Sequence, residues 1–278
     1  MTPSRTPRLL RPLFGALVLA ALTTGGCGDA GPEEGVVWEL VWSDEFEGAV
    51  GTLPDPQKWG FDVGTDWGNQ QLEYDTDRAE NASLDGNGNL AITARRESFM
   101  GQDYTSARIT TEDKFEPTYG KFEARIQLPV GQGYWPAFWL LGADFETAGW
   151  PQTGEIDVME YRGQEPTIVH GTVHGPGYSA AAGITARLDA AQRLDQDFHV
   201  YGVEWEEDII RWYFDGELFH TVTRTTASTR GDWVFDHPFY VILNLAVGGS
   251  FVGAAPTPDI TFPQSMLVDW VRVYEQAR

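Results

Sequence analysis

Apolar and polar residues alternate in short segments along most of this chain, and turn residues separate the segments. The alternation is clearest over 119–128 and 266–274. A period of two is typical of strands that bury one face. The segment 239–246 is apolar nearly throughout, with Asn244 as its odd polar residue. A run of this kind indicates a strand that is buried on both faces.

The same pattern predicts about a dozen strands in all. Further strands are expected at 36–42, 90–95, 104–111, 167–174, 198–205, 209–214 and 218–222. Asp215-Gly216 is a typical hairpin turn, and the polar stretch 185–196 is expected to hold the only short helical turn. Many short strands separated by turns predict an all-β sandwich whose two sheets curve to form a groove.

The composition suits one large β domain that acts on a neutral polymer. The chain has 278 residues, 31 glycines, 16 prolines and a formal net charge of −22. Such a negative charge repels nucleic acid and anionic substrates, so neither is expected as a partner. The single cysteine excludes an intramolecular disulfide. The sequence has neither a Gly-rich phosphate loop nor a Cys/His metal cluster, and the chemistry is expected to need no cofactor.

Residues 1–26 have the composition of a signal peptide, because basic residues precede an apolar stretch too short to span a bilayer. Cys27 follows small residues, which resembles a bacterial lipoprotein signal, although Thr24 stands where such signals usually carry Leu. We expect lipidation of Cys27, a tether over 27–35 and a catalytic domain over 36–278. The alternative is ordinary secretion with an incidental cysteine. The protein is therefore expected to be secreted or in the cell envelope, with membrane contact only through the lipid.

Three carboxylates stand close together at Glu155, Asp157 and Glu160, among apolar neighbours. On a helix they would scatter around the axis. On a strand Glu155 and Asp157 share a face, but strict alternation puts Glu160 on the opposite one. One extra residue at Val158-Met159, a β-bulge, returns Glu160 to the face of the other two. The sequence thus predicts a bulged strand with three acids in one row.

This row has the chemistry of a glycosidase. Like charges repel, so at least one of the acids is expected to hold its proton above the usual pKa. A protonated carboxyl beside an ionised one is the pair that cleaves a glycosidic bond. The Cα atoms of Glu155 and Glu160 would lie about 13 Å apart. Side chains that lean together reduce this gap toward the roughly 5–5.5 Å of a retaining enzyme. A solvated acidic strand is the alternative, but it leaves the surrounding Trp, Pro, Met and Tyr unexplained.

Several other residues suit a sugar-binding cleft. Amides and aromatic residues mix over 66–74, although a plain polar loop also has this composition. Trp135 and Trp139 would share a strand face and either stack on sugar rings or join the core, while Pro136 makes regular pairing doubtful. Arg108 is either a cleft residue or an ordinary strand charge.

Two histidines, His170 and His174, would share one face of the strand predicted at 167–174. Their spacing of about 13 Å on a strand is too long for both to bind one metal ion. One of them is expected to line the cleft as a hydrogen-bonding side chain.

Together these residues resemble glycoside hydrolase family 16, and most closely its laminarinase-like endo-β-1,3-glucanases from bacteria. The resemblance covers 36–278 and rests first on Gly154-Glu-Ile-Asp-Val-Met-Glu160, which follows Trp150-Pro151. Supporting segments are Asp44-Glu-Phe46, Trp67-Gly-Asn69, Ser106-Ala-Arg108, Tyr119-Gly120, Trp135-Pro-Ala-Phe-Trp139, Gly171-Thr-Val-His174, Leu243-Asn-Leu-Ala-Val-Gly-Gly249 and Val268-Asp-Trp-Val-Arg-Val-Tyr274. The extra residue before Glu160 is similar to laminarinases, whereas bacterial mixed-linkage lichenases usually lack it.

The resemblance implies a curved β-jelly roll, with a substrate cleft on the concave face. It implies Glu155 as nucleophile, Glu160 as general acid/base and Asp157 hydrogen-bonded to the nucleophile. The implied substrate-binding residues are Asn69, Arg108, Trp135, Trp139, Trp150 and His174, with Asn69 and Arg108 on the donor side and His174 near the acid/base. A structural Ca²⁺ is frequent in the family, and here it implies the carboxylate of Asp269 and the backbone oxygens of Glu45 and Gly88. Asp269 has no evident partner in its apolar strand, which favours this site.

The sequence therefore predicts a monomeric, retaining endo-β-1,3-glucanase with a β-glucan polysaccharide as its substrate. The same chemistry on mixed-linkage glucan or a galactan is one alternative, because Gln71, Asp75 and Phe251 depart from residues common in the family. A non-catalytic glucan-binding protein is another alternative, although such relatives typically lose the acids.

Overall fold

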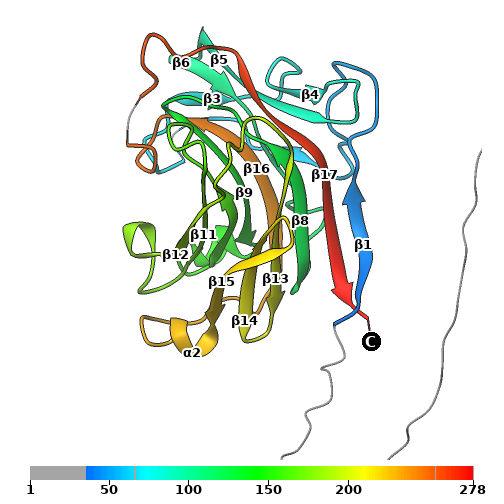
Figure 1. Ribbon diagram of the computed structural model, residues 1–278, viewed down its shortest axis with the longest axis vertical. Coiled ribbons are helices and arrows are strands. Elements are labelled where there is room, and N and C mark those ends of the chain that lie inside the picture. Colours follow the sequence, from blue (N-terminus) through cyan, green and yellow to red (C-terminus); the bar gives the residue numbers. More distant parts are fainter. Residues whose placement is uncertain (1–35, 66, 254, 278) are drawn as a thin grey trace, which may run out of the picture. The chain divides into compact units, whose positions relative to one another are not determined.

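The computed structural model describes residues 36–278 except Asp66, Ala254 and Arg278. Nearly all of the regular structure in this part is β, in two sheets that form two layers (Figure 1). The predicted all-β sandwich is confirmed.

The predicted signal segment 1–26, the tether 27–35 and Cys27 lie outside the described residues. None of the helices in the described part is long and apolar enough to cross a membrane.

The larger sheet has ten strands. They are β1 (Trp38–Asp44), β3 (Glu73–Asp75), β4 (Ala82–Leu84), β5 (Leu90–Phe99), β6 (Gln102–Ser106), β8 (Gly120–Gln127), β13 (His199–Glu206), β14 (Ile209–Phe214), β15 (Glu217–Thr223) and β17 (Gln264–Gln276). Their spatial order is β15-β14-β13-β8-β17-β5-β6-β3, with β1 beside β17 and β4 beside β5. The strands pair antiparallel except for β3 with β6.

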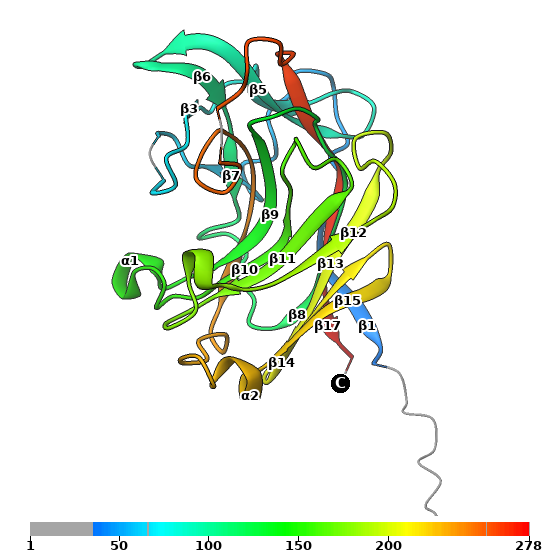
Figure 2. The ribbon, with the colours of Figure 1, turned by 60° about the vertical axis from the view of Figure 1, so that its left-hand side comes forward.

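The smaller sheet has seven antiparallel strands. They are β2 (Gly60–Phe61), β7 (Arg108–Thr110), β9 (Tyr134–Gly142), β10 (Glu155–Glu160), β11 (Ile168–His174), β12 (Ile184–Asp189) and β16 (Phe239–Val247). Their order is β12-β11-β10-β9-β16-β7-β2, and the run of neighbours from β9 to β12 can be followed in Figure 2.

The core lies between the two sheets because each strand turns every second side chain inward. Phe122, Ala124 and Ile126 on β8 are fully buried, as their alternation predicts, and they face buried residues of the smaller sheet such as Phe138. All nine residues of β16 are buried. We call the face of the seven-stranded sheet that is turned away from this core the outer face.

Two local predictions were wrong. The segment 104–111 is not one strand, because the chain passes at Ala107 from β6 in the larger sheet to β7 in the smaller one. The polar stretch 185–196 begins as part of β12, whose residues are alternately half-buried and exposed. Alternation on a partly exposed strand includes many polar residues, and composition alone does not distinguish it from a turn. The short helices of the described part lie elsewhere, at α1 (Phe145–Ala148), η1 (Ala180–Ala182) and α2 (Arg224–Ala227).

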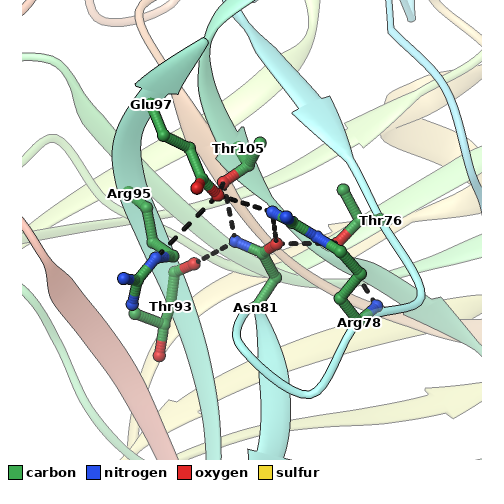
Figure 3. Close-up of polar contacts among 7 residues, drawn as sticks. All are labelled: Thr76, Arg78, Asn81, Thr93, Arg95, Glu97 and Thr105. Carbon is green, nitrogen blue, oxygen red and sulfur yellow. Dashed lines mark hydrogen bonds and ion pairs between the residues drawn. The ribbon is translucent and has the colours of Figure 1, made fainter. Parts of the chain in front are cut away.

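A network of polar side chains joins the segment between β3 and β4 to β5 and β6 (Figure 3). The fully buried Asn81 amide donates to the Thr93 carbonyl and to Thr105 Oγ1, at 3.0 Å each, and its oxygen accepts from Arg78 at 2.8 Å. Arg78 and Thr105 also donate to Glu97, and this hydrogen bonding lowers the pKa of the Glu97 carboxyl. Every member of this network has a partner, so it stabilises the strands without leaving a reactive group.

Candidate active site

The predicted bulge is present on β10, and it brings the three acids to one face. On the β9 side Asp157 pairs with Trp139 and Met159 with Phe138, so Val158 is the extra residue. The side chains of Ile156, Val158 and Met159 are all buried in the core. Glu155, Asp157 and Glu160 therefore point together to the outer face.

A tryptophan from the opposite sheet holds the bulge in place. Trp212 on β14 is fully buried, and its indole N–H donates to the backbone oxygen of Asp157 at 2.8 Å. Gly171 on β11 leaves the room for this ring, because a Cβ there would lie 2.6 Å from Trp212 Cδ1. A carbonyl that the bulge removes from regular pairing thus still has a donor, as a buried carbonyl requires.

Burial keeps two of the three acids protonated. Asp157 is only 2 % exposed and Glu160 8 %. Burial is the largest cause that raises the pKa of Glu160 well above its usual value, followed by the charge of Asp157. Burial and then the charge of Glu155 raise the pKa of Asp157 in the same direction. The raised pKa expected from charge repulsion is found for both acids, but desolvation contributes more to it.

Glu155 and Glu160 each accept one hydrogen bond from an indole. Trp150 Nε1 donates to Glu155 Oε2 at 2.7 Å, and Trp135 Nε1 donates to Glu160 Oε1 at 3.0 Å. Trp150 is 42 % exposed, so its ring also offers a surface for a sugar. Trp135 is 8 % exposed and packs on Phe251, so in this structure it positions Glu160 rather than offering an open stacking surface.

The two histidines on β11 stand opposite the two glutamates. Glu155 pairs with His174 and Glu160 with His170. His174 Nε2 lies 3.2 Å from Asp157 Oδ2 and 3.9 Å from Glu155 Oε1. The family resemblance implied His174 beside the acid/base; in the structure His174 contacts Asp157 and Glu155, and its charge also acts on Glu160. His170 is the cross-strand neighbour of Glu160, and burial lowers its pKa to about 4, which keeps it neutral.

A second group of side chains extends the outer face beyond β9. The Arg108 guanidinium lies between the rings of Trp67 and Trp139, at 4.9 and 4.8 Å from their centroids, and pairs with Asp62 at 2.7 Å. Trp139 Nε1 donates to Asn244 Oδ1 at 2.8 Å, which gives the odd polar residue of β16 a partner on this face. Arg108 is therefore part of an aromatic group rather than an isolated strand charge. We call Trp67, Arg108 and Trp139 the stacked platform.

Asn69 is exposed on the loop that carries Trp67. Its backbone oxygen accepts from Ser250 N at 2.8 Å, which joins this loop to the one that follows β16. The structure thus places Asn69 at the same end of the outer face as the stacked platform.

Sequence reasoning missed a pair of buried acids below this loop. Glu73 and Asp75 on β3 are 1 % and 2 % exposed. Burial raises the pKa of Asp75 to about 7 and raises that of Glu73 well above its usual value. Their spacing of two residues on a strand was the available signal, but 66–74 was considered only as a sugar-binding segment or a plain polar loop, and no strand was predicted there.

The argument that favoured calcium at Asp269 was wrong, because Asp269 does have a partner. Arg125 Nη1 lies 2.5 Å from Asp269 Oδ2, and the Glu45 carboxylate pairs with Arg272 at 2.8 Å. A guanidinium already neutralises each carboxylate, so these side chains offer no unpaired charge that calls for a cation. Gly88 lies in a turn near the side chain of Glu47.

One group of metal-type donors occurs in the described ranges, and it includes two of the three candidate catalytic acids. Ligand atoms of Glu155, Asp157 and His174 all lie within 4.8 Å of one another. A metal ion bound there would occupy the carboxylate that hydrolysis needs. The arrangement of the acids is that of a glycoside hydrolase, with the half-buried carboxyl of Glu155 and the buried carboxyl of Glu160 on the same face.

Comparison with known proteins agrees with this class. The family model of glycosyl hydrolases family 16 matches residues 63–272, and the chain belongs to this family. It is 44 % identical to the beta-glucanase of Rhodothermus marinus, over 97 % of this chain and 94 % of that protein. It is 46 % identical to the solved catalytic domain of an endo-1,3-beta-glucanase (laminarinase) from Thermotoga petrophila, with a TM-score of 0.82, 87 % of this chain covered and 100 % of that domain. The solved laminarinase of Rhodothermus marinus gives 44 % identity and a TM-score of 0.81, over 88 % of this chain and 100 % of that structure.

Proposed function

We propose that the protein is a retaining endo-β-1,3-glucanase of the laminarinase type. The observation that carries this proposal is the bulge on β10, which turns Glu155 and Glu160 to one face and leaves them in different environments. Relatives that carry the names laminarinase and beta-glucanase, at 44–46 % identity, support the choice of substrate.

The chemistry divides into two displacements. Glu155 attacks the anomeric carbon while Glu160 donates its proton to the oxygen that leaves, so that a covalent glycosyl–enzyme forms. Glu160, now ionised, takes a proton from water, and that water releases the sugar from Glu155 with the original β configuration. Asp157, buried between the two, keeps a negative charge away from Glu160 as long as it is protonated.

Stereochemistry tests this mechanism directly. Proton NMR of laminarin during the first minutes of digestion is expected to show the β-anomer of the product before mutarotation. An α-anomer that forms first would reject double displacement. A panel of laminarin, mixed-linkage β-glucan, agarose and a sulfated galactan, read by reducing-end release, tests the substrate, and laminarin is expected to be cleaved fastest.

A non-catalytic glucan-binding protein on this fold is the second candidate. It would bind laminarin without releasing reducing ends in the same panel. The three acids and the raised pKa of Glu160 favour catalysis, because a binding protein has no use for a buried acid that carries a proton.

Attachment of a lipid to Cys27 and a position in the cell envelope also belong to this proposal, as does a monomeric state. The lipid and the cell-envelope position rest on the composition of residues 1–27. Mass spectrometry of the protein from its native membrane fraction would show a diacylglycerol adduct on Cys27, and replacement of Cys27 by Ser would release the protein into the soluble fraction. A structural Ca²⁺ rests on the family resemblance alone.

A further inference from the structure

A small apolar cluster on the outer face stands apart from the core between the two sheets. It consists of Trp135, Ala246 and Val252, which are buried, and the half-buried Phe251 packs against them. Trp135 and Ala246 are cross-strand partners on β9 and β16, whereas Phe251 and Val252 come from the loop that follows β16. Because Trp135 donates to Glu160, this cluster lies directly beside the candidate acid/base.

Phe251 is the member of this cluster that contacts both groups flanking Glu160. Its ring centroid lies 5.1 Å from that of Trp135, at an interplanar angle of 34°, and 5.3 Å from that of His170, edge to face. Trp135 Nε1 donates to Glu160 Oε1 at 3.0 Å, and His170 is the cross-strand partner of Glu160. One ring from a loop far away in sequence therefore packs on both groups that flank the acid.

Two residues between β10 and β11 hold Phe251 and its loop. The Arg162 guanidinium lies 4.2 Å from the centroid of the Phe251 ring, within the range of a cation–π contact. Gln164 Nε2 donates to the backbone oxygen of Val252 at 2.8 Å. The segment that directly follows Glu160 in the chain thus holds the loop whose ring packs on the neighbours of Glu160.

The loop is also fixed where it passes Trp135. Gly249 has a φ of +96°, and a Cβ there would lie 3.0 Å from Trp135 Cζ3. The next residue, Ser250, donates its backbone N–H to the backbone oxygen of Asn69 at 2.8 Å. The backbone that precedes Phe251 is therefore set by the fold, and so is the place of its ring against the indole.

The indole also determines which oxygen of Glu160 carries the proton. A general acid must direct its proton at the oxygen that leaves. In a protonated carboxyl one oxygen holds the hydrogen and the other accepts hydrogen bonds. Trp135 Nε1 donates to Oε1, so the proton belongs on Oε2. The orientation of the Glu160 carboxyl thus depends on where Trp135 is held.

We propose that Phe251 is a positioning residue for acid catalysis, which holds Trp135 in the place where its indole orients the Glu160 carboxyl toward the leaving oxygen. Without the ring, Trp135 gains the space that Phe251 occupied, and its bond to Glu160 is no longer enforced. A misplacement of about 1 Å can cost about 10²-fold in rate. The inference rests on the proposed function for the reaction, but the restraint of Trp135 by Phe251 does not depend on hydrolysis.

Two substrates with different leaving groups test this role. Laminarin needs a proton on its leaving oxygen, whereas a dinitrophenyl β-glycoside of laminaribiose releases a stable phenolate without one. The ratio kcat/KM reports the steps up to the glycosyl–enzyme. Phe251→Leu is expected to lower kcat/KM about 10- to 10²-fold on laminarin and less than about twofold on the aryl glycoside. Equal losses on both substrates would overturn the proposal.

Three further variants separate positioning from a general loss of structure. Phe251→Tyr keeps the ring and is expected to keep kcat/KM on laminarin within about threefold of the wild type, and a loss as large as that of Phe251→Leu would refute a role of the ring. Phe198 is the matched control, a half-buried ring before β13 with the Arg125 guanidinium 4.7 Å from its centroid, and Phe198→Leu is expected to change neither substrate. Gln164→Leu removes the bond to Val252 and is expected to give the same split at smaller size, which keeps the test if Phe251→Leu does not fold.

Proton NMR of the indole N–H groups tests the restraint without any substrate. The Trp135 N–H, assigned by its loss in Trp135→Phe, is expected to exchange slowly with water because it is bonded to Glu160 and buried. Exchange should be at least about tenfold faster in Phe251→Leu and unchanged in Phe198→Leu. Equal exchange rates in all three proteins would refute the restraint. If the wild type cleaves neither substrate but these rates differ, the proposed function fails and the restraint stands.

Discussion

Two polar clusters of this protein, each built around a buried side chain, behave in opposite ways. In the network around Asn81, the Glu97 carboxylate contacts Arg78 and Thr105, and its pKa is lowered. On the outer face, Asp157 and Glu160 are buried beside another acid, and their pKa values are raised. Both clusters join neighbouring strands, but only one of them includes a cation for its acid.

The difference separates stabilising polar groups from reactive ones. A buried polar group that has all its partners contributes to stability and has little free energy to gain from a ligand. A buried acid without a cation costs stability and keeps its proton, which is what a general acid requires near neutral pH. The donors to Glu155 and Glu160 are neutral indoles, which position a carboxyl without adding a positive charge beside it.

The largest predicted difference is in kcat, between the Glu→Gln substitution at Glu155 on the outer face and the same substitution at Glu97 in the network around Asn81. Glu155→Gln removes the nucleophile and should lower kcat on laminarin on the order of 10⁴-fold or more. Glu97→Gln should leave kcat within about twofold, because Glu97 contacts Arg78, Arg95 and Thr105 in the network around Asn81. Initial rates of reducing-end release measure both. Activity near the wild-type level in Glu155→Gln would show that Glu155 is not the nucleophile.

The pH profile should report the raised pKa of Glu160. Glu160 donates a proton to the leaving group, so kcat/KM should fall as the pH rises through the pKa of Glu160 and be retained below it. Glu160→Gln should lower kcat about 10²- to 10⁴-fold and abolish this alkaline limb. Rates from pH 4 to pH 10 measure the limb, and its persistence in Glu160→Gln would assign it to another group.

A smaller effect, on stability alone, is expected from the satisfied network. Asn81→Ala removes the amide that donates to the Thr93 carbonyl and to Thr105 Oγ1 and that accepts from Arg78, and should lower the free energy of unfolding by about 2 kcal/mol. Asn87→Ala, in an exposed turn, is the matched control and should change it by less than about 0.5 kcal/mol. Urea unfolding measures both variants. Equal decreases in the free energy of unfolding would mean that the buried network contributes no more stability than an exposed turn.

The smallest effect is expected at Asp269. Its ion pair with Arg125 is about one third exposed on each side, so Asp269→Asn in the presence of a chelator should cost less than about 1 kcal/mol. Thermal unfolding with and without added Ca²⁺ tests whether Asp269 binds calcium. A Tm that rises with Ca²⁺ in the wild type but not in Asp269→Asn would restore the calcium site that the family resemblance implied.

The local pattern of apolar and polar residues was sufficient to predict most of the strands and the row of three acids. The period of two placed Phe122 and Ala124 in the core, and the two residues between Asp157 and Glu160 required a bulge if the acids were to meet. The pattern did not predict that the chain passes from one sheet to the other at Ala107, because the alternation of apolar and polar residues continues through this point. It also failed for Asp269, since the partner Arg125 lies 144 residues away along the chain.

The sequence by itself determined that this is an all-β glycoside hydrolase with its acids at Glu155, Asp157 and Glu160, because alternation and a bulge are local properties. Only the tertiary structure decided which donors reach those acids. Trp212 comes from the opposite sheet to hold the bulge, and Trp135 and Trp150 each place an indole on one glutamate. Burial, which raises the pKa of Glu160, is likewise a sum over the atoms that surround the acid, and those atoms come from segments far apart in the chain.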